Sequence, residues 1–381
     1  MKNGVEFPLE SLSFKIRKRD LLEAIDYGNH KGVSRHKNFF EKLMKKDVIH
    51  GYSLLIPLEN VPKIKDALMS PMNVAEQNTI SEFGEVIPSK RLTHNQSKKY
   101  SASGTSINSR VQKEKLQDCM YGHCVLRMVH YILALRCHYP NRRIVMQKID
   151  YKSAYQRMHF NWRSAIQSIT QYEEFGMIAL QATFGGCPGP YKWGVISEST
   201  ADLANILMNH PDWNPDILHS PNYISPKDNL LPIDIPFVKA LPTIVEPPIE
   251  NHGKSDIYID DNTMITVDIG DNLKRARAAI PLAIHIIGRP VDPKDSIPCL
   301  DLISKDKLKA EGALEEEKVI IGWCFNTRKL TLSLPNHKFK AWNRTIALIK
   351  KRGNKQRRIG NINWTSYPCH SNSSNTVTFS K

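Results

Sequence analysis

Tyr258-Ile259-Asp260-Asp261 is the stretch that decides the fold of this chain. Two adjacent carboxylates stand here between two runs, 256–259 and 262–267, that alternate like β-strands. The near period of two and the β-branched and aromatic residues predict a β-hairpin with the acidic pair at its tip. Adjacent carboxylates on a tight turn repel each other unless a cation neutralises them, and hard oxygen ligands suit Mg²⁺. An ordinary acidic turn is the alternative, because aspartate favours turns.

A third carboxylate ends another predicted strand. The apolar run 144–150 finishes on Asp150, and a segment of helical composition, 161–174, follows further along. A carboxylate at a strand end beside an acidic hairpin is the geometry that a two-metal site requires, with ions about 3.5–4 Å apart. Such a site stabilises both the attacking and the leaving oxygen of a phosphoryl displacement. The alternative role for Asp150 is to cap the following helix.

Five segments in order resemble the reverse transcriptase domain of retroelements. Asp150-Tyr151-Lys152-Ser153-Ala154-Tyr155 resembles motif A, Phe184-Gly185-Gly186-Cys187-Pro188-Gly189-Pro190 resembles motif B, and residues 258–261 resemble motif C. Residues 90–97 with 103–108 resemble the fingers segment, and residues 320–328 with Leu334-Pro335 resemble motif E and the strand after it. The Gly-Trp, Thr-Arg and Leu-Pro pattern of that last segment is most similar to tyrosine-recombinase (DIRS-type) retrotransposons. The resemblance runs from about residue 87 to residue 338.

The chain departs from the family pattern at a few positions. Asn95 stands where the family usually has aspartate, and Asn326 stands where aspartate is common. Cys187-Pro188 replaces the more usual polar and small residues of motif B. The three acidic positions of the predicted metal site are all intact.

The resemblance implies a fold and a division of the chain. The implied fold is α+β: a right-hand polymerase with an antiparallel-sheet palm, α/β fingers and a partial, truncated thumb. Residues 1–60 form an N-terminal extension, and residues 61–145 a fingers-like segment. The palm takes residues 146–335, with a finger insertion and a Pro-rich loop at 211–250, where recurring prolines predict irregular structure. Residues 336–381 begin the thumb and end in a truncated or disordered basic tail.

The implied function is that of an RNA-directed DNA polymerase of a retroelement. It would join a dNTP to a primer 3′-hydroxyl with two Mg²⁺ ions, or Mn²⁺ in their place, held by the catalytic residues Asp150, Asp260 and Asp261. The alternative is a catalytically decayed remnant that only binds nucleic acid. An RNA-dependent RNA polymerase is disfavoured by Tyr258 and Tyr155, because such enzymes usually have glycine before the acidic pair and a different gate after motif A.

The resemblance also assigns binding residues. Those expected to bind the nucleotide are Lys90, Arg91, Ala154, Tyr155, Phe184 and Gly185. Arg91 matches a fingers arginine that reaches the triphosphate, and the ring of Tyr155 would exclude a 2′-hydroxyl. Gly185 would let the backbone approach the templating base pair, because it has no Cβ. Those expected to position the primer end are Tyr258, Gly322 and Trp323.

Composition agrees with a nucleic-acid partner. The formal net charge is +15, which favours phosphate contacts and counterion release on binding an RNA or DNA template with its primer. Basic residues concentrate at 15–19, 45–46, 90–99 and 350–358. Any one such run is more often a solvated face than a binding site.

The sequence also bears on compartment and metals. No apolar stretch is long enough to span a bilayer, the N-terminus has no signal-peptide region, and seven cysteines are scattered. We therefore expect an intracellular protein, cytoplasmic or nuclear and not secreted, with no membrane partner; the oligomeric state is unknown. The Cys and His residues of 119–138 lack zinc-finger spacing, and the apolar positions among them predict an amphipathic helix.

Overall fold

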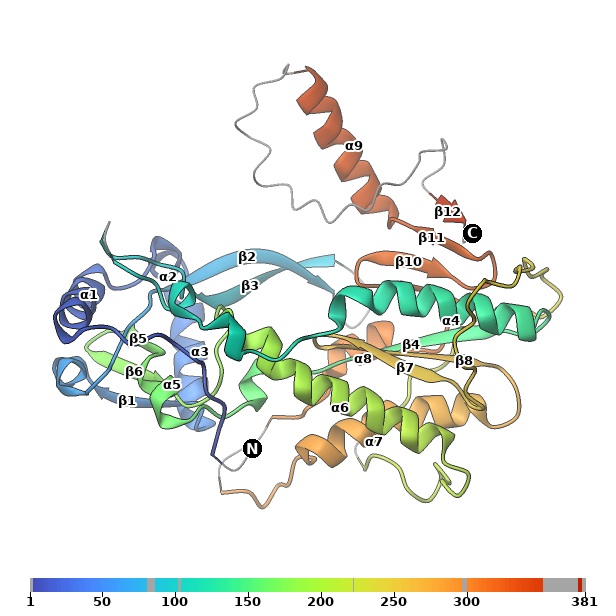
Figure 1. Cartoon of the computed structure of the whole chain (residues 1–381), viewed down its shortest axis with the longest axis horizontal. Helices are drawn as coiled ribbons and strands as arrows, with labels where there is room; N and C mark the ends of the chain where they lie inside the picture. The colour runs from blue at the N-terminus through green and yellow to red at the C-terminus, as the bar shows by residue number, and fades with distance from the viewer. Residues whose placement is uncertain are drawn as a thin grey trace.

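The computed structural model combines helices with antiparallel sheets (Figure 1). Every register between its strands is antiparallel, as predicted for an α+β chain. The residues that the structure describes are 3–80, 86–101, 104–221, 223–296, 300–351 and 376–378. No helix in these ranges is both long enough and apolar enough to cross a membrane.

The central sheet has the strand order β4-β8-β7. Its strands are β4 (Ile144–Asp150), β7 (Lys254–Tyr258) and β8 (Asp261–Val267). The predicted acidic hairpin is therefore confirmed as β7–β8. All of β4 is buried except the partly exposed Lys148, which explains why the strand begins with three consecutive apolar residues, 144–146, rather than alternating.

Helices cover both faces of this sheet (Figure 1). α6 (Gly189–Asn209) and α7 (Asn272–Gly288) lie on one face, where Val145, Ile149 and Met264 join their core. α4 (Cys124–His138), the helix predicted from the apolar spacing of this segment, covers the other face against Ile144 and Met146. Because β4 is packed on both sides, its end and the carboxylate there hold a fixed position.

A second sheet has the order β1-β6-β5, from β1 (Ser53–Pro57), β5 (Ile169–Tyr172) and β6 (Phe175–Ala179). The helices near it in the chain are α1 (Phe14–Tyr27), α2 (Lys31–Arg35), α3 (Lys37–Ile49) and α5 (Trp162–Ile166). The expected helix over 161–174 is thus wrong beyond Ile166. Asn161 caps a single short helix, and Ile169–Tyr172 pairs with β6 instead.

A long hairpin, β2 (Met72–Ile80) with β3 (Val86–His94), extends toward the central sheet (Figure 1).

The last sheet has the order β12-β11-β10-β9. Its strands are β9 (Glu317–Ile320), β10 (Trp323–Asn326), β11 (Thr331–Ser333) and β12 (Thr376–Thr378). α8 (Lys305–Glu311) precedes this sheet and contacts β4, whereas α9 (Asn336–Lys351) follows β11 and projects from the body. Short 3₁₀ turns complete the described structure: η1 (Leu58–Lys63), η2 (Asn108–Arg110), η3 (Lys113–Lys115), η4 (Tyr121–His123) and η5 (Ala154–Arg157).

Two segments are predicted to be irregular, the Pro-rich loop and the basic tail. The described residues between α6 and β7 contain no helix or strand, which agrees with the predicted loop. This loop is tied to the sheet, because Gln147 Nε2 of β4 donates a 3.0 Å hydrogen bond to the Tyr223 hydroxyl. Most of the basic tail lies outside the described residues, but residues 376–378 pair with β11, so that part is not irregular.

Candidate active site

The acidic pair sits on a two-residue turn. Tyr258 pairs with Asp261, which leaves Ile259 and Asp260 as the loop of the β7–β8 hairpin. Ile259 has a φ of 57°, a left-handed conformation that a β-branched residue rarely adopts. The indole Nε1 of Trp193, on α6, donates a 2.7 Å hydrogen bond to the Ile259 carbonyl. The strained turn is therefore held from the helix layer beneath it, as is common at functional sites.

Asp150 and Asp261 are opposite partners in the β4–β8 register. Asp150 is 3% exposed, and neither of its carboxylate oxygens has a hydrogen bond of good geometry among the described residues. Two lysine ammonium groups lie close enough to balance the negative charge of Asp150. Lys148 Nζ lies 3.4 Å from Asp150 Oδ1 and 3.5 Å from Asp261 Oδ1, and Lys307 Nζ of α8 forms an ion pair with Asp150 Oδ2.

The carboxylates perturb one another's ionisation. Burial raises the pKa of Asp261, and the neighbouring Asp150 carboxylate raises that pKa further. Burial followed by the Asp150 charge also raises the pKa of Asp260. Burial opposes ionisation of Asp150 too, yet the polar contact with Asp261 and the charges of Lys148 and Lys307 lower its pKa overall. Asp150 is therefore the more readily ionised of the two facing carboxyl groups, and Asp261 the more readily protonated.

These residues fit a hard divalent cation by their chemistry. Asp150 and Asp261 offer facing carboxyl groups that lie beside two ammonium groups, and Asp260 precedes Asp261 on the turn. Within the described ranges, no group of three or more His, Cys, Asp or Glu side chains already surrounds a point where an ion could bind. The metal assignment of Asp150, Asp260 and Asp261 thus stays a prediction. It requires Lys307 to leave Asp150.

A cavity of about 540 Å³ opens beside the turn. It brings together residues from the β2–β3 hairpin, η5, the segment after β6 and the acidic turn. Five of the predicted site residues line it: Arg91, Ala154, Tyr155, Phe184 and Asp260. Segments far apart in sequence therefore converge on one space, and the size of that space suits a small organic ligand.

Phe184 contacts two other residues that are predicted to bind the nucleotide and that line this cavity. The Arg91 guanidinium lies 4.7 Å from the centre of the Phe184 ring, a cation–π contact. The Tyr155 ring lies 6.0 Å from the same ring at an angle of 33°. Burial, followed by the Asp260 charge, raises the pKa of Tyr155 to about 12, so its hydroxyl stays protonated.

Gly185 is required by chain packing. Its φ is +128°, and a Cβ at this position would lie 2.0 Å from the His94 carbonyl oxygen at the end of β3. The His94 amide donates to the Phe184 carbonyl, and Asn108 Nδ2 donates to the Gly185 carbonyl. The contact that glycine permits in this structure is therefore with β3, whereas approach to a templating base pair stays a prediction.

The other predicted residues are not among those that line the cavity. Lys90 is exposed on β3 opposite Glu76. The Tyr258 ring packs 6.0 Å from the ring of Tyr121. Gly322 is in the turn between β9 and β10 with a φ of 80°, and Trp323 begins β10. Their role at a primer end stays a prediction.

The structure adds site residues that the sequence did not indicate. Lys46 and Asp47, near the end of α3, line the cavity together with Lys152 and Lys307. Burial raises the pKa of Asp47 to about 6, whereas burial and then the Lys152 charge lower the pKa of Lys46. Lys148, beside the acidic centre, could be inferred from the sequence, because residues two apart on a strand share a face and Asp150 follows it by two. Lys152 lies within the motif A segment, whereas Lys46, Asp47 and Lys307 reach the cavity through tertiary packing.

Comparisons with known proteins found similarity to solved structures alone. No family model matches it, and no curated protein matches it. A foamy viral protease-reverse transcriptase in complex with RNA/DNA hybrid aligns with a TM-score of 0.46 and 12% identity, over 89% of this chain and 30% of that chain. A related foamy viral structure with dsDNA gives a TM-score of 0.40 and 14% identity, over 90% of this chain and 47% of that one. The chain thus spans less than half of either relative, and a likeness at this level assigns no family.

Proposed function

We propose that this chain is an RNA-directed DNA polymerase, the reverse transcriptase of a retroelement with a DIRS-type motif pattern. One observation carries the proposal: Asp150, Asp260 and Asp261 meet at the end of β4 and the β7–β8 turn, beside a cavity. Nucleotidyl transfer needs carboxylates at such a place, next to a space for a triphosphate and a primer end.

The proposal gives each layer a role. The β4-β8-β7 sheet with α6 and α7 would be the palm, the β2–β3 hairpin a part of the fingers, and α9 the start of a thumb. This division is supported by the motif order in the sequence and by the convergence of Arg91, Tyr155 and Asp260 on one cavity. The partners would then be a template, RNA or DNA, with its primer, and dNTPs.

The chain's own residues would divide the chemistry as follows. Asp150, Asp260 and Asp261 would hold Mg²⁺, which lowers the pKa of the primer 3′-hydroxyl and neutralises the triphosphate when bound. Arg91 offers a planar guanidinium to phosphate oxygens, with Lys46 and Lys152 on the wall of the same cavity. The Tyr155 ring would lie under the sugar and exclude a 2′-hydroxyl by its bulk.

The alternative is a remnant that binds nucleic acid without polymerising. The observation that favours it is the pairing of Asp150 with both Lys148 and Lys307, which neutralises the acid without a metal ion. In the polymerase, Lys307 must move aside; its side chain is 42% exposed and has room to do so.

Primer extension separates the two functions. The full chain is incubated with a primed RNA template, dNTPs and Mg²⁺ or Mn²⁺, and the products are resolved by length. Template-dependent extension supports the polymerase. Tight binding of the primed template with no extension under either metal would support the remnant.

A further inference from the structure

α6 packs against β7, the edge strand of the central sheet, and its side chains bind the backbone of that strand. Asn205 Nδ2 donates a 3.0 Å hydrogen bond to the Ser255 carbonyl, and the Ser255 amide donates to Asn205 Oδ1. One helical turn further on, Asn209 Nδ2 donates to the Gly253 carbonyl. An edge strand has unpaired backbone groups, and these side chains pair with some of them. The helix therefore fixes the start of the strand that leads to the acidic turn.

The same helix holds the acidic turn at the other end of β7. Trp193 is 0% exposed, and its indole makes the 2.7 Å hydrogen bond to the Ile259 carbonyl. Hairpin loops of two residues usually place glycine where φ is positive, because a side chain is crowded there. Ile259 has a φ of 57°, so the bond from Trp193 opposes relaxation of a strained backbone. Asp260 is the next residue, and its position depends on this turn.

α6 also holds the chain beside Asp150. The ring of Tyr151 packs edge-on against the ring of Trp193, with the ring centres 4.9 Å apart. The Tyr151 hydroxyl lies 2.6 Å from Thr200 Oγ1, and Thr200 Oγ1 donates its own proton to the Ile196 carbonyl. The Tyr151 hydroxyl is therefore the donor to Thr200. Both acid-bearing segments are thus tied to buried side chains about two turns apart on one helix.

We propose that α6 sets the separation of the two acid-bearing segments. Trp193 positions Asp260 through the backbone of the turn. Thr200 positions Asp150 through Tyr151, the residue that follows it. The inference rests on the proposed function, because it assumes that these carboxylates hold metal ions.

The separation of the carboxylates decides what the acidic centre can bind. Two ions about 3.5–4 Å apart need carboxylates at matching positions. Removing a group that holds a metal ligand in place typically weakens metal binding by about 10- to 100-fold. Trp193 and Thr200 are not among the residues that line the 540 Å³ cavity. Their substitution should therefore disturb the metal ligands without removing a contact to the nucleotide.

The test measures Mn²⁺ binding by the full chain without primer or dNTP. Trp193→Phe keeps an aromatic ring and removes the indole donor, so the apparent Kd for Mn²⁺ should rise about tenfold. The titration is followed by electron paramagnetic resonance. Trp213→Phe is the matched control, because the Trp213 indole is also buried and donates a 2.9 Å hydrogen bond to the Leu218 carbonyl. That indole lines a cavity that does not include the acidic turn, so the control loses the same kind of bond elsewhere.

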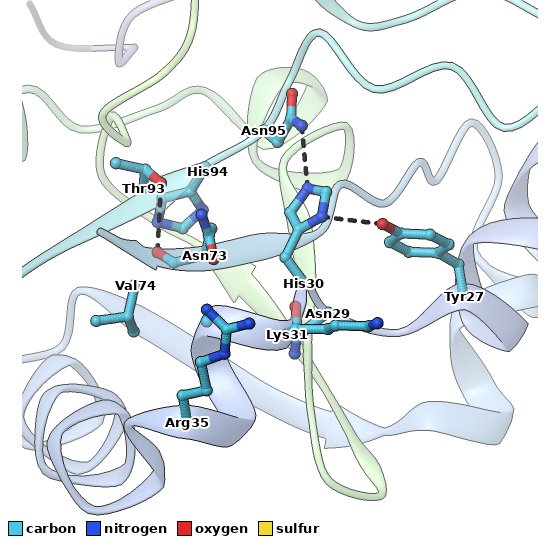
Figure 2. Close-up of a pocket in the computed structure, with 11 residues that line it drawn as sticks. Tyr27, Asn29, His30, Lys31, Arg35, Asn73, Val74, Thr93, His94 and Asn95 are labelled. Atoms are coloured by element: carbon cyan, nitrogen blue, oxygen red, sulfur yellow. Dashed lines mark hydrogen bonds between the residues drawn. The ribbon is translucent and has the colours of Figure 1, made fainter. Parts of the chain in front are cut away.

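Thr200→Val is the second variant, and it decides the question if Trp193→Phe does not fold. It keeps the branched shape and removes the acceptor of the Tyr151 hydroxyl, so the Kd for Mn²⁺ should rise about three- to tenfold. Its control is Thr93→Val in the cavity of about 910 Å³ at the base of the β2–β3 hairpin (Figure 2). There the Thr93 hydroxyl donates a 3.3 Å hydrogen bond to the Asn73 carbonyl.

The outcomes separate a positioning role from a general loss of stability, which urea unfolding of all four variants measures. A higher Kd in the α6 variants, with the controls within about twofold of the parent, supports the proposal. Equal shifts in variants and controls would overturn it, and so would an unchanged Kd in the α6 variants. A parent that shows this pattern yet extends no primer keeps the positioning role and loses only the polymerase assignment. A parent that binds no Mn²⁺ would overturn the metal site and this inference together.

Discussion

Asp150 and Asp261 face each other across the β4–β8 pair, and the Lys148 ammonium lies 3.4 Å from Asp150 and 3.5 Å from Asp261. The same ammonium lies 2.9 Å from Glu311 on α8. Burial alone would lower the pKa of Lys148, but these carboxylates raise it, so it stays charged. A permanent cation therefore supports one side of the acidic centre, whereas the more exposed Lys307 supports the other.

Lys307 should compete with a divalent cation for Asp150. Substitution Lys307→Gln removes one cation from Asp150 Oδ2, so the apparent Kd for Mn²⁺ should fall by about three- to tenfold. The measurement is a Mn²⁺ titration followed by electron paramagnetic resonance. Lys305→Gln is the control, because Lys305 pairs with Asp301 instead and its removal should leave the affinity unchanged. An unchanged Kd in the Lys307 variant would show that this lysine does not guard the metal site.

Tyr155 should select the sugar. Tyr155→Val should raise the efficiency of ribonucleotide incorporation relative to deoxynucleotide incorporation by at least about tenfold, because the barrier is the volume of the ring. The measurement compares kcat/KM for matched rNTP and dNTP on one primed template. An unaltered ratio would assign Tyr155 to packing against Phe184 alone.

Lys46 should contribute to triphosphate binding from α3. Lys46→Gln should raise the KM for dNTP about tenfold while the Kd for primed template stays nearly constant, since the lysine lines the cavity proposed to bind the nucleotide. Its neighbour Lys45 is exposed and does not line that cavity, so Lys45→Gln is the matched control. Similar KM values in the two variants would remove α3 from the site.

Asp47 should make stability depend on pH. Its folded-state pKa of about 6 lies above the ordinary value of 3.8, so its contribution to stability is present at low pH and is lost as pH rises through about 6. Asp47→Asn should therefore raise the free energy of unfolding near pH 8 by up to about 3 kcal/mol, and by little near pH 4. Urea unfolding at the two pH values measures this, with the exposed Asp26→Asn as a control. A gain independent of pH would show that the buried charge of Asp47 is not what destabilises the fold.

Local periodicity was enough to predict the acidic hairpin. The alternation around Asp260 and the apolar run ending at Asp150 are properties of short segments, and the structure pairs them as expected. The helix expected over 161–174 failed because Ile169 and Thr170 pair with β6, a tertiary contact that composition does not report.

The remaining site residues depend on contacts between distant segments. Lys307 reaches Asp150 only because α8 packs on β4, and Lys46 reaches the cavity only because α3 packs near β1. No spacing within either segment signals such a contact. The sequence motifs therefore indicated the acidic residues of the candidate site, while the lysines beside them became visible only in the folded chain.

Primer extension by Asp260→Asn tests the central claim most directly. Asn keeps the size of the side chain but removes the charge proposed to hold the metal ion, so extension should fall at least about 10³-fold, with template binding within a few-fold of the parent. Asp268→Asn, next to β8 and paired with Arg143 away from the cavity, should extend primers like the parent. Equal extension by the Asp260 variant and the parent would contradict the account.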